Sequence, residues 1–180
     1  MNKLIVISGP SGVGKGTIVN ELLKKGDYAL SVSCTTRAPR VGEREGVSYF
    51  FITREKFMSM IEEDGFLEYD NHFENYYGTP KDFVEKQLQT KNVILEIEVN
   101  GAFKAKKSYP EAILIMILPP SMDELKARLV GRGTENAEKI ENRLSRIDYE
   151  LSQTDKYDYT VINDDLERAV GEIEDIIKNS

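Results

Sequence analysis

Short, continuous runs of branched apolar residues alternate along the chain with segments of helical periodicity. The apolar runs span Leu4–Ile7, Val93–Leu95, Ile113–Leu118 and Tyr159–Ile162. Such runs are typical of strands covered on both faces. The helical patterns lie between them, at Gly16–Lys25, Lys81–Gln89, Gly101–Lys107, Ser121–Val130, Ala137–Thr154 and Leu166–Ile177. This alternation predicts an α/β fold, with right-handed crossovers and a central parallel sheet flanked by helices.

Two segments interrupt the alternation. From Ser31 to Tyr77 the chain turns to short polar and aromatic strands with one helical stretch, Arg54–Glu63, which predicts an insert beside the main sheet. Gly131–Asn136 is a charged, glycine-bearing connection between two predicted helices. Because few apolar residues anchor either segment, we expect both to be moving parts.

A glycine-rich segment follows the first apolar run directly. It reads Ser8-Gly9-Pro10-Ser11-Gly12-Val13-Gly14-Lys15-Gly16-Thr17 and carries the spacing G-x-x-x-x-G-K between a predicted strand and a predicted helix. In that setting backbone N–H groups and the positive end of the helix converge on an anion, and the lysine reaches the outer phosphates. The alternative is a flexible glycine turn with a surface lysine. The usual Ser or Thr after the lysine is Gly16, so the pattern does not predict direct Mg²⁺ ligation by this loop.

A second group of anion-binding side chains lies in the predicted insert. Arg37 and Arg40 are three residues apart, and Pro39 keeps the backbone between them out of a helix. Ser33 and Tyr49 add hydroxyl groups. Two arginine forks with nearby hydroxyls favour a phosphate group as the ligand. A solvated basic loop is the alternative interpretation.

Carboxylates in the predicted strands indicate a ligand that donates hydrogen bonds. Glu68 lies in an aromatic strand pattern, and a half-buried carboxylate is costly unless something donates to it. The N1–H and N2–H₂ groups of guanine suit a glutamate, whereas adenine presents an acceptor at N1; Thr79 could add a hydroxyl for O6. Glu96 and Glu98, two apart in a strand, would point to the same side, either into a pocket or toward solvent.

Composition narrows the classes of partner. The chain has 180 residues, of which 24 are basic and 31 acidic, and its net charge is −7. This length predicts one compact domain, and the acidic balance argues against nucleic acid and anionic membranes as partners. Nothing in the sequence indicates an obligate protein partner. The arginines are nevertheless clustered, which suits a small, multiply charged anion; one cluster is Arg37, Arg40 and Arg44, and the other is Arg128, Arg132, Arg143 and Arg146.

The numbers of cysteine and histidine residues and the lengths of the apolar stretches predict an intracellular protein without a cysteine-based zinc site. Cys34 and His72 are the only residues of their kinds, which excludes internal disulfides, cysteine-based zinc sites and paired-histidine metal patterns. The apolar run before Ser8 is too short for a signal-peptide core, and no stretch reaches the length of a membrane span. We therefore expect a cytoplasmic location.

Taken together, separated motifs along the chain resemble those of guanylate kinases. They are S-G-P-S-G-V-G-K-G-T, S-x-T-T-R-x-P-R-x-G-E, N-Y-Y-G-T, the segment Leu125–Glu135 and V-I-N-D-D, in the family's order and spacing over nearly the whole chain. The resemblance implies a P-loop kinase with a central parallel sheet, a small mixed α/β GMP-binding insert and a short lid. It implies a single domain with a core at about 1–30, 80–125 and 144–180, an insert at about 31–79 and a lid at about 126–143.

The resemblance also implies an activity and its residues. The reaction is Mg²⁺-dependent transfer of the γ-phosphoryl group of ATP to GMP, with dGMP as a further candidate acceptor, giving GDP and ADP. The implied catalytic residues are Lys15, Arg128, Arg132 and Arg143. ATP is bound by Gly9, Pro10, Ser11, Gly12, Val13, Gly14, Lys15, Gly16, Thr17 and Asn163. GMP is bound by Ser33, Arg37, Arg40, Tyr49, Glu68, Tyr77, Thr79 and Glu98. No direct Mg²⁺ ligand is assigned, and Thr17 and Glu96 are candidates for contact through water.

Two departures from the family's pattern leave alternatives open. Glu96 and Glu98 stand where many members have aspartates, and Gly16-Thr17 is similar to the adenylate kinase form of the loop. One alternative is a catalytically inactive, guanylate-kinase-like module that binds peptides, against which Gly14, Lys15 and the arginines argue. The other is a kinase for another nucleoside monophosphate, against which Glu68 and Thr79 argue.

Overall fold

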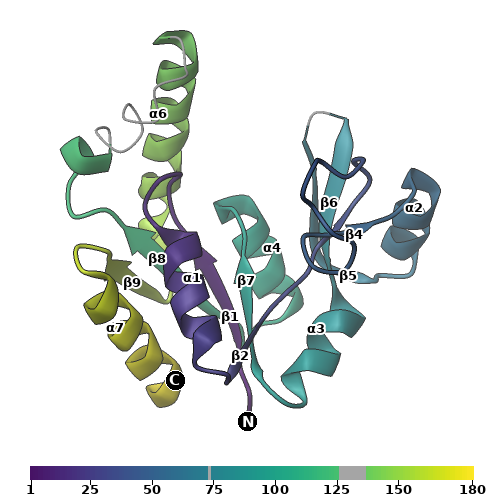
Figure 1. Ribbon diagram of the computed structural model, residues 1–180, viewed down its shortest axis with the longest axis horizontal. Helices are drawn as coiled ribbons and strands as arrows, with labels where there is room; N and C mark the ends of the chain where they lie inside the picture. Colours follow the sequence, from purple (N-terminus) through teal and green to yellow (C-terminus); the bar gives the residue numbers. More distant parts are fainter. Residues whose placement is uncertain (73, 126–136) are drawn as a thin grey trace.

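Two sheets, both with helices packed against them, make up the protein (Figure 1). The computed structural model describes residues 1–72, 74–125 and 137–180. The elements of the larger sheet and its helices are β1 (Leu4–Ser8), α1 (Lys15–Lys24), β2 (Tyr28–Leu30), α3 (Lys81–Leu88), β7 (Asn92–Glu96), α4 (Val99–Ser108), β8 (Ile113–Leu118), α6 (Ala137–Ser152), β9 (Tyr159–Ile162) and α7 (Leu166–Asn179). Residues 122–125 are also helical, and a short 3-10 helix spans Thr154–Lys156. None of the described helices is both long and apolar enough to cross a membrane.

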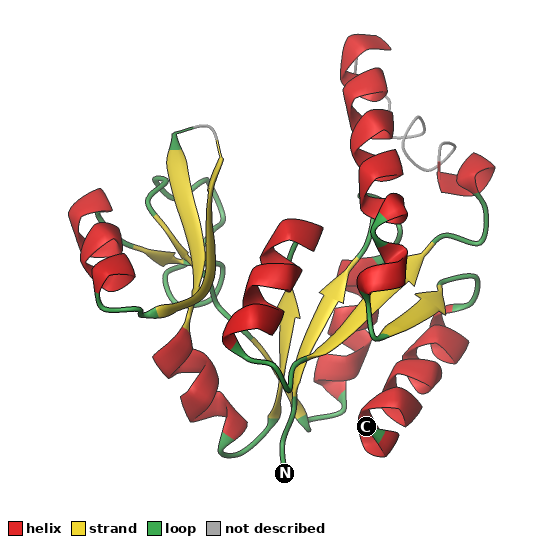
Figure 2. Cartoon of the chain, turned by 180° about the vertical axis from the view of Figure 1, so that it is seen from behind, coloured by secondary structure: helices red, strands yellow, loops and turns green. Residues whose placement is uncertain are grey.

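The larger sheet is parallel throughout and has the strand order β2-β7-β1-β8-β9. Every residue of β1 is buried, because helices cover both faces. Ile5 and Ile7 pack with α1 and α7 on one face, while Leu4 and Val6 pack with α3 and α4 on the other. Figure 1 looks onto the first of these faces and Figure 2 onto the second. The α/β prediction is therefore confirmed, with its four apolar runs as β1, β7, β8 and β9.

The edge strand β2 was not predicted. It has three residues, of which only Tyr28 is buried, so its sequence lacks the continuous apolar run that identified the other strands. Its pairing with β7 supplies its stability.

A second, mixed sheet lies in the segment between β2 and α3. Its strands are β3 (Cys34–Thr35), β4 (Phe50–Phe51), β5 (Phe66–His72) and β6 (Asn75–Pro80), in the order β4-β3-β6-β5. The predicted helix over Arg54–Glu63 is α2 (Arg54–Glu62), and the Thr53 side chain caps its first turn by accepting from Lys56 N–H. A small core of Cys34, Phe57 and Phe66 holds α2 to the sheet.

The two sheets and α6 surround the carboxyl ends of the parallel strands. Figures 1 and 2 show the second sheet and α6 rising on opposite sides of this edge. In open α/β sheets, ligands bind in the crevice outside the carboxyl ends of the strands. The glycine-rich loop after β1 and the carboxylates at the end of β7 both lie there, because β1 and β7 are neighbours.

The core of the second sheet makes a stability prediction. Phe57 is fully buried, and its ring stacks on Phe66 with centroids 4.4 Å apart. Phe57→Ala should lower the free energy of unfolding by about 3–5 kcal/mol, because the truncation leaves a cavity. The exposed Val47→Ala is the control, with a change within about 0.5 kcal/mol. Urea unfolding of both variants measures this, and equal losses would contradict the assignment of Phe57 as the core of the sheet.

Candidate active site

The glycine-rich loop has the strand before it and the helix after it that a phosphate loop requires. Gly14 caps α1 with φ 99°, in the left-handed region that favours glycine. A Cβ at Gly14 would collide with the Asn163 amide, so the residue also needs its small size. Asn163 Nδ2 donates to the Val13 carbonyl at 2.8 Å, and the Val13 side chain is fully buried. The loop is therefore fastened from the turn between β9 and α7.

Lys15 folds over this loop. Its Nζ donates to the Gly9 carbonyl and, at 3.2 Å, to the Pro10 carbonyl. Burial lowers the pKa of Lys15, while the carboxylates of Glu96, Glu150 and Glu98 oppose that shift. The lysine charge is thus held among carbonyl oxygens and carboxylates at the place where a phosphate group would supply the negative charge.

Three of the predicted anion-binding residues converge in the second sheet. Arg37 Nε donates to Tyr77 Oη at 3.3 Å, and its guanidinium lies 5.6 Å from the centroid of the Tyr49 ring. The guanidinium also pairs with Glu43 at 2.8 Å, which raises the pKa of Arg37 and lowers that of Glu43. Arg40 is exposed and donates its backbone N–H to the same Glu43 carboxylate at 2.7 Å. Glu43 therefore organises this end of the site, a role that the sequence did not suggest.

Glu68 and Thr79 are brought together at the other end of the second sheet. The Glu68 side chain is buried, with 8% of the residue exposed, and its Oε1 accepts a hydrogen bond from Thr79 Oγ1 at 2.6 Å. A Cβ at Gly101 of α4 would lie 3.1 Å from Glu68 Oε2, so the glycine leaves the space that this oxygen occupies. Burial raises the pKa of Glu68. A buried carboxylate of this kind is ready to accept from a ligand that donates hydrogen bonds.

Two cavities meet at the end of β7. The first has a volume of about 430 Å³ and is lined by Ser33, Tyr49, Glu68, Asp70, Tyr77, Gly78, Glu96, Ile97, Glu98, Gly101 and Arg146. The second has a volume of about 400 Å³ and is lined by Gly9, Ser11, Lys15, Glu96, Ile97, Glu98, Arg146, Ile147 and Glu150. Both sizes are in the range of small-molecule sites. Because Glu96, Ile97, Glu98 and Arg146 line both cavities, ligands in the two would lie next to each other.

The expectation that Glu96 and Glu98 share one strand is wrong. Strand β7 ends at Glu96, and Glu98 is the residue that precedes α4. Both residues still line both cavities, and the backbone of Glu98 remains extended beyond the end of the strand. Of the predicted catalytic arginines, Arg128 and Arg132 lie outside the described residues, as does the side chain of Arg143.

Sequence reasoning placed Arg146 of α6 in a cluster of arginines that suits an anion, without a specific task, and gave no role to Glu150 of the same helix. Arg146 pairs with the Glu98 carboxylate, and its Nε lies 3.6 Å from Glu150 Oε1. Only 7% of Glu150 is exposed, and burial raises its pKa. The signal in the sequence was the spacing of four between the two residues on a predicted helix, which places them on one face.

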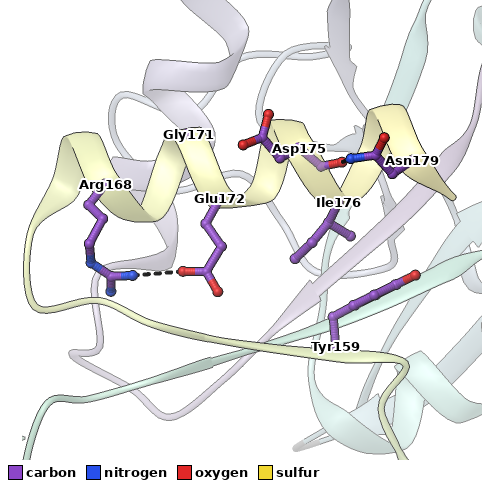
Figure 3. Close-up of a pocket in the computed structure, with 7 residues that line it drawn as sticks. All are labelled: Tyr159, Arg168, Gly171, Glu172, Asp175, Ile176 and Asn179. Atoms are coloured by element: carbon purple, nitrogen blue, oxygen red, sulfur yellow. Dashed lines mark hydrogen bonds and ion pairs between the residues drawn. The ribbon is translucent and has the colours of Figure 1, made fainter.

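A third hollow lies away from these cavities, between α7 and Tyr159 of β9 (Figure 3). Arg168 is the arginine among its lining residues, and it is already paired with Glu172 at 2.7 Å and with Asp164 at 2.6 Å. Glu172 and Asp175 make the hollow acidic. It does not have the converging donors of an anion site.

The loop fits a magnesium ion only in an indirect way. Glu96 Oε1 lies 3.8 Å from the position of a Cβ on Gly16, so one carboxylate reaches the loop. Among the described residues, no group of three or more His, Cys, Asp or Glu side chains could hold a metal ion. These residues fit an ion held mainly by ligand oxygens and water, in line with the habit of Mg²⁺ of keeping its water shell.

The fold and the glycine-rich loop define a P-loop protein, and two cavities adjoin beside this loop. The family model described as guanylate kinase matches residues 1–180. The chain is 54% identical to the guanylate kinase of Caldanaerobacter subterraneus over 97% of its own length and 85% of the relative's. It is 54% identical to that of Clostridium acetobutylicum over 97% and 84%. A crystal structure of guanylate kinase from Anaplasma phagocytophilum superposes with a TM-score of 0.75 at 33% identity, over 99% of this chain and 85% of that one.

The chain therefore belongs to the guanylate kinase family.

The raised pKa of Glu68 makes a prediction about stability and pH. A carboxyl group whose pKa is higher in the folded state favours folding while it is protonated, and this contribution is lost as pH rises through the folded-state pKa. Glu68→Gln cannot lose a proton there. The melting temperature of Glu68→Gln minus that of the unchanged protein should therefore increase from pH 5 to pH 8. Each unit by which the folded-state pKa is raised changes the free energy of unfolding by about 1.4 kcal/mol over this range.

Glu43→Gln is the matched control for this experiment. The pKa of Glu43 is lowered by Arg37, so Glu43 stays ionised over the whole range from pH 5 to pH 8. The difference between Glu43→Gln and the unchanged protein should be flat over that range. A flat difference for Glu68→Gln as well would show that Glu68 carries no raised pKa.

Proposed function

We propose that this guanylate kinase transfers the γ-phosphoryl group of ATP to GMP, with GMP in the cavity beneath the second sheet and the ATP phosphates in the loop after β1. The observation that carries this proposal is that the two cavities share Glu96, Ile97, Glu98 and Arg146. An oxygen of the GMP phosphate forms a bond to the γ-phosphorus. The bond from that phosphorus to the β,γ-bridging oxygen breaks, and its electron pair stays on ADP.

No side chain needs to act as a general base in this reaction. A phosphate monoester has a second pKa near 6, so the attacking group of GMP is already largely dianionic at neutral pH. What the protein must supply is positive charge and backbone N–H groups for the transferring phosphoryl. Lys15 and the arginines supply this positive charge. The reaction needs no catalytic histidine, which agrees with the presence of a single histidine in the sequence.

On the acceptor side, we assign the GMP phosphate to Arg37, Tyr49 and Tyr77, whose side chains converge. Ser33 lines the same cavity, and Arg40 would have to move in from its exposed position. Glu68 and Thr79 read the guanine edge, in support of which they already hydrogen-bond to each other. Glu98 adds a carboxylate where this cavity adjoins the second one.

On the donor side, we assign the ATP phosphates to the loop from Gly9 to Thr17, with Lys15 on the outer phosphates. Asn163 holds the Val13 carbonyl in the structure, so it supports the loop as well as any contact with adenine. Bound Mg²⁺ would neutralise charge on the ATP phosphates, and Glu96 would contact it through water. Arg128, Arg132 and Arg143 complete the proposed catalytic set.

The proposed function also assigns a role to each part of the chain. We propose that residues 31–79 form the GMP-binding insert, residues 126–143 the lid, and the remainder the core of a single domain. ATP and GMP are then the partners that the activity requires, and the cytoplasm, where both occur, is the proposed location. The proposal includes no nucleic acid, membrane or obligate protein partner.

A coupled assay with GMP, dGMP, AMP, UMP and CMP tests the proposed function. Turnover with GMP above all other acceptors supports it, and the rate with dGMP decides whether the 2′-hydroxyl is read. Turnover led by AMP, UMP or CMP would favour a kinase for another nucleotide, against which the acceptor-only Glu68 argues. No turnover at all would favour the inactive, peptide-binding module, against which Lys15 and the adjoining cavities argue.

Lys15→Ala should lower kcat with GMP and ATP by about 10²–10³-fold, as the loss of one preorganised donor does elsewhere. The dissociation constant of GMP should stay nearly unchanged, because Lys15 lines the other cavity. Lys24→Ala is the control, since Lys24 is an exposed lysine on the same helix. Steady-state rates and GMP titrations measure both effects, and a near-normal rate for Lys15→Ala would refute the phosphate loop.

Glu68→Gln should weaken the selection of GMP over the other monophosphates. An amide offers one acceptor oxygen where the carboxylate offers two, so one of the two guanine N–H groups would face an amide donor. Sites that hydrogen-bond their substrate discriminate by large factors, and we expect the ratio of kcat/KM for GMP over AMP to fall at least about 100-fold. An unchanged ratio would move the guanine reader to another residue.

A further inference from the structure

Arg146 is a cation between the two cavities for which the proposed function has no task. It projects from α6 and lines both the acceptor cavity and the donor cavity. Its guanidinium pairs with the Glu98 carboxylate through one terminal nitrogen, and its Nε lies 3.6 Å from Glu150 Oε1. Arg146 therefore lies where the two cavities adjoin.

The pair between Arg146 and Glu98 is easy to exchange. The two side chains are 52% and 55% exposed, and ion pairs with that access to water contribute only about 0–1 kcal/mol. Arginine binds a phosphoryl group through two parallel, charge-assisted hydrogen bonds, which are stronger than the bond to a solvated carboxylate. An incoming phosphoryl group can therefore take the place of Glu98 at a small cost.

Glu150 differs from Glu98 in its burial. With only 7% of the residue exposed, it stays beside the guanidinium, and Arg146 and Lys15 are the cations that interact with it. Contact with Nε fixes one edge of the guanidinium, while one terminal nitrogen contacts Glu98, which lines both cavities. Glu150 is thus in a position to orient Arg146 before and after Glu98 is displaced.

We propose that Arg146 is a further catalytic residue, whose guanidinium exchanges Glu98 for the transferring phosphoryl group while Glu150 keeps it oriented. It stabilises the charge on the equatorial oxygens as the bond from the GMP oxygen to phosphorus forms and the bond to the ADP oxygen breaks, with the electron pair leaving on ADP. Glu150 acts through Arg146 and is a positioning residue. This inference rests on the proposed function.

Kinetics of Arg146→Gln, Arg146→Ala and Arg146→Lys test the proposal. We expect kcat to fall about 10–100-fold in the first two, because one donor to the transition state is lost, with KM for GMP and ATP changed less than about threefold. Arg146→Lys should recover part of the rate, since it restores a charge without the fork. A two-substrate mimic, in which adenosine and guanosine are joined through five phosphates, should lose more affinity than ATP and GMP lose separately.

Arg168→Gln is the matched control for the loss of a half-exposed, doubly paired arginine. Arg168 is 47% exposed and is paired with Glu172 of α7 (Figure 3) and with Asp164 in the turn before this helix. It lines neither cavity. The kcat of Arg168→Gln should equal that of the unchanged protein. Melting temperatures of the Arg146 variants should fall only a little, because the pair with Glu98 is exposed and Lys15 still acts on the buried Glu150.

The role of Glu150 is tested by a double-mutant cycle. Glu150→Gln should lower kcat by itself, and adding it to Arg146→Gln should cause no further loss, because both act through one guanidinium. Losses that multiply would overturn the positioning role. An unchanged kcat in Arg146→Gln, or a loss confined to KM for GMP, would overturn the catalytic role. The unchanged protein is assayed alongside, and its failure to phosphorylate GMP would refute the proposed function instead.

Discussion

The site places several cations close together at one edge of an acidic protein, even without a bound phosphate. Carboxylates hold the described cations in this position. Lys15 lies near Glu96 and Glu150, Arg37 pairs with Glu43, and Arg146 pairs with Glu98. Without these partners the cations would repel one another, and Lys15, whose burial lowers its pKa, would lose solvation without compensation. The carboxylates therefore make the empty site stable, and each incoming phosphate group replaces an interaction that the protein already makes.

This arrangement depends on how the two sheets are joined. Helix α4 begins just after Glu98 and contacts both sides of the crevice. On one side Lys104 Nζ donates to the Tyr69 carbonyl of β5 at 2.8 Å, and on the other Tyr149 Oη of α6 donates to Asn100 Oδ1 at 2.8 Å. One helix thus fixes the distance between the second sheet, which holds Glu68, and α6, which holds Arg146. The two cavities share a wall because of this helix.

The sequence predicted the parts of the fold that local patterns determine. Continuous apolar runs predicted β1, β7, β8 and β9, because a strand covered on both faces has no polar side to display. The phosphate loop was predicted by its glycines and lysine, and Glu68 with Thr79 by their chemistry. Strand β2 was missed because its pairing with β7 joins residues that are distant in the sequence, and the end of β7 at Glu96 was not predicted. Glu43 and Glu150 were missed although their arginine partners are near in the sequence, six residues away at Arg37 and four at Arg146, whereas the pair of Arg146 with Glu98 comes from the packing of separate elements.

In the proposed role of Glu68 at the guanine edge, the burial of its carboxylate would produce selectivity by the same physical constraint. The side chain keeps one hydrogen bond, from Thr79, and Gly101 leaves room for its second oxygen. A base that donates two hydrogen bonds offsets the cost of keeping this carboxylate buried and ionised. A base that presents an acceptor leaves that cost in place and adds repulsion between lone pairs. Because an unsatisfied buried group costs more than a good contact gains, rejection of the wrong base depends more on the burial of Glu68 than on the strength of its bonds to guanine.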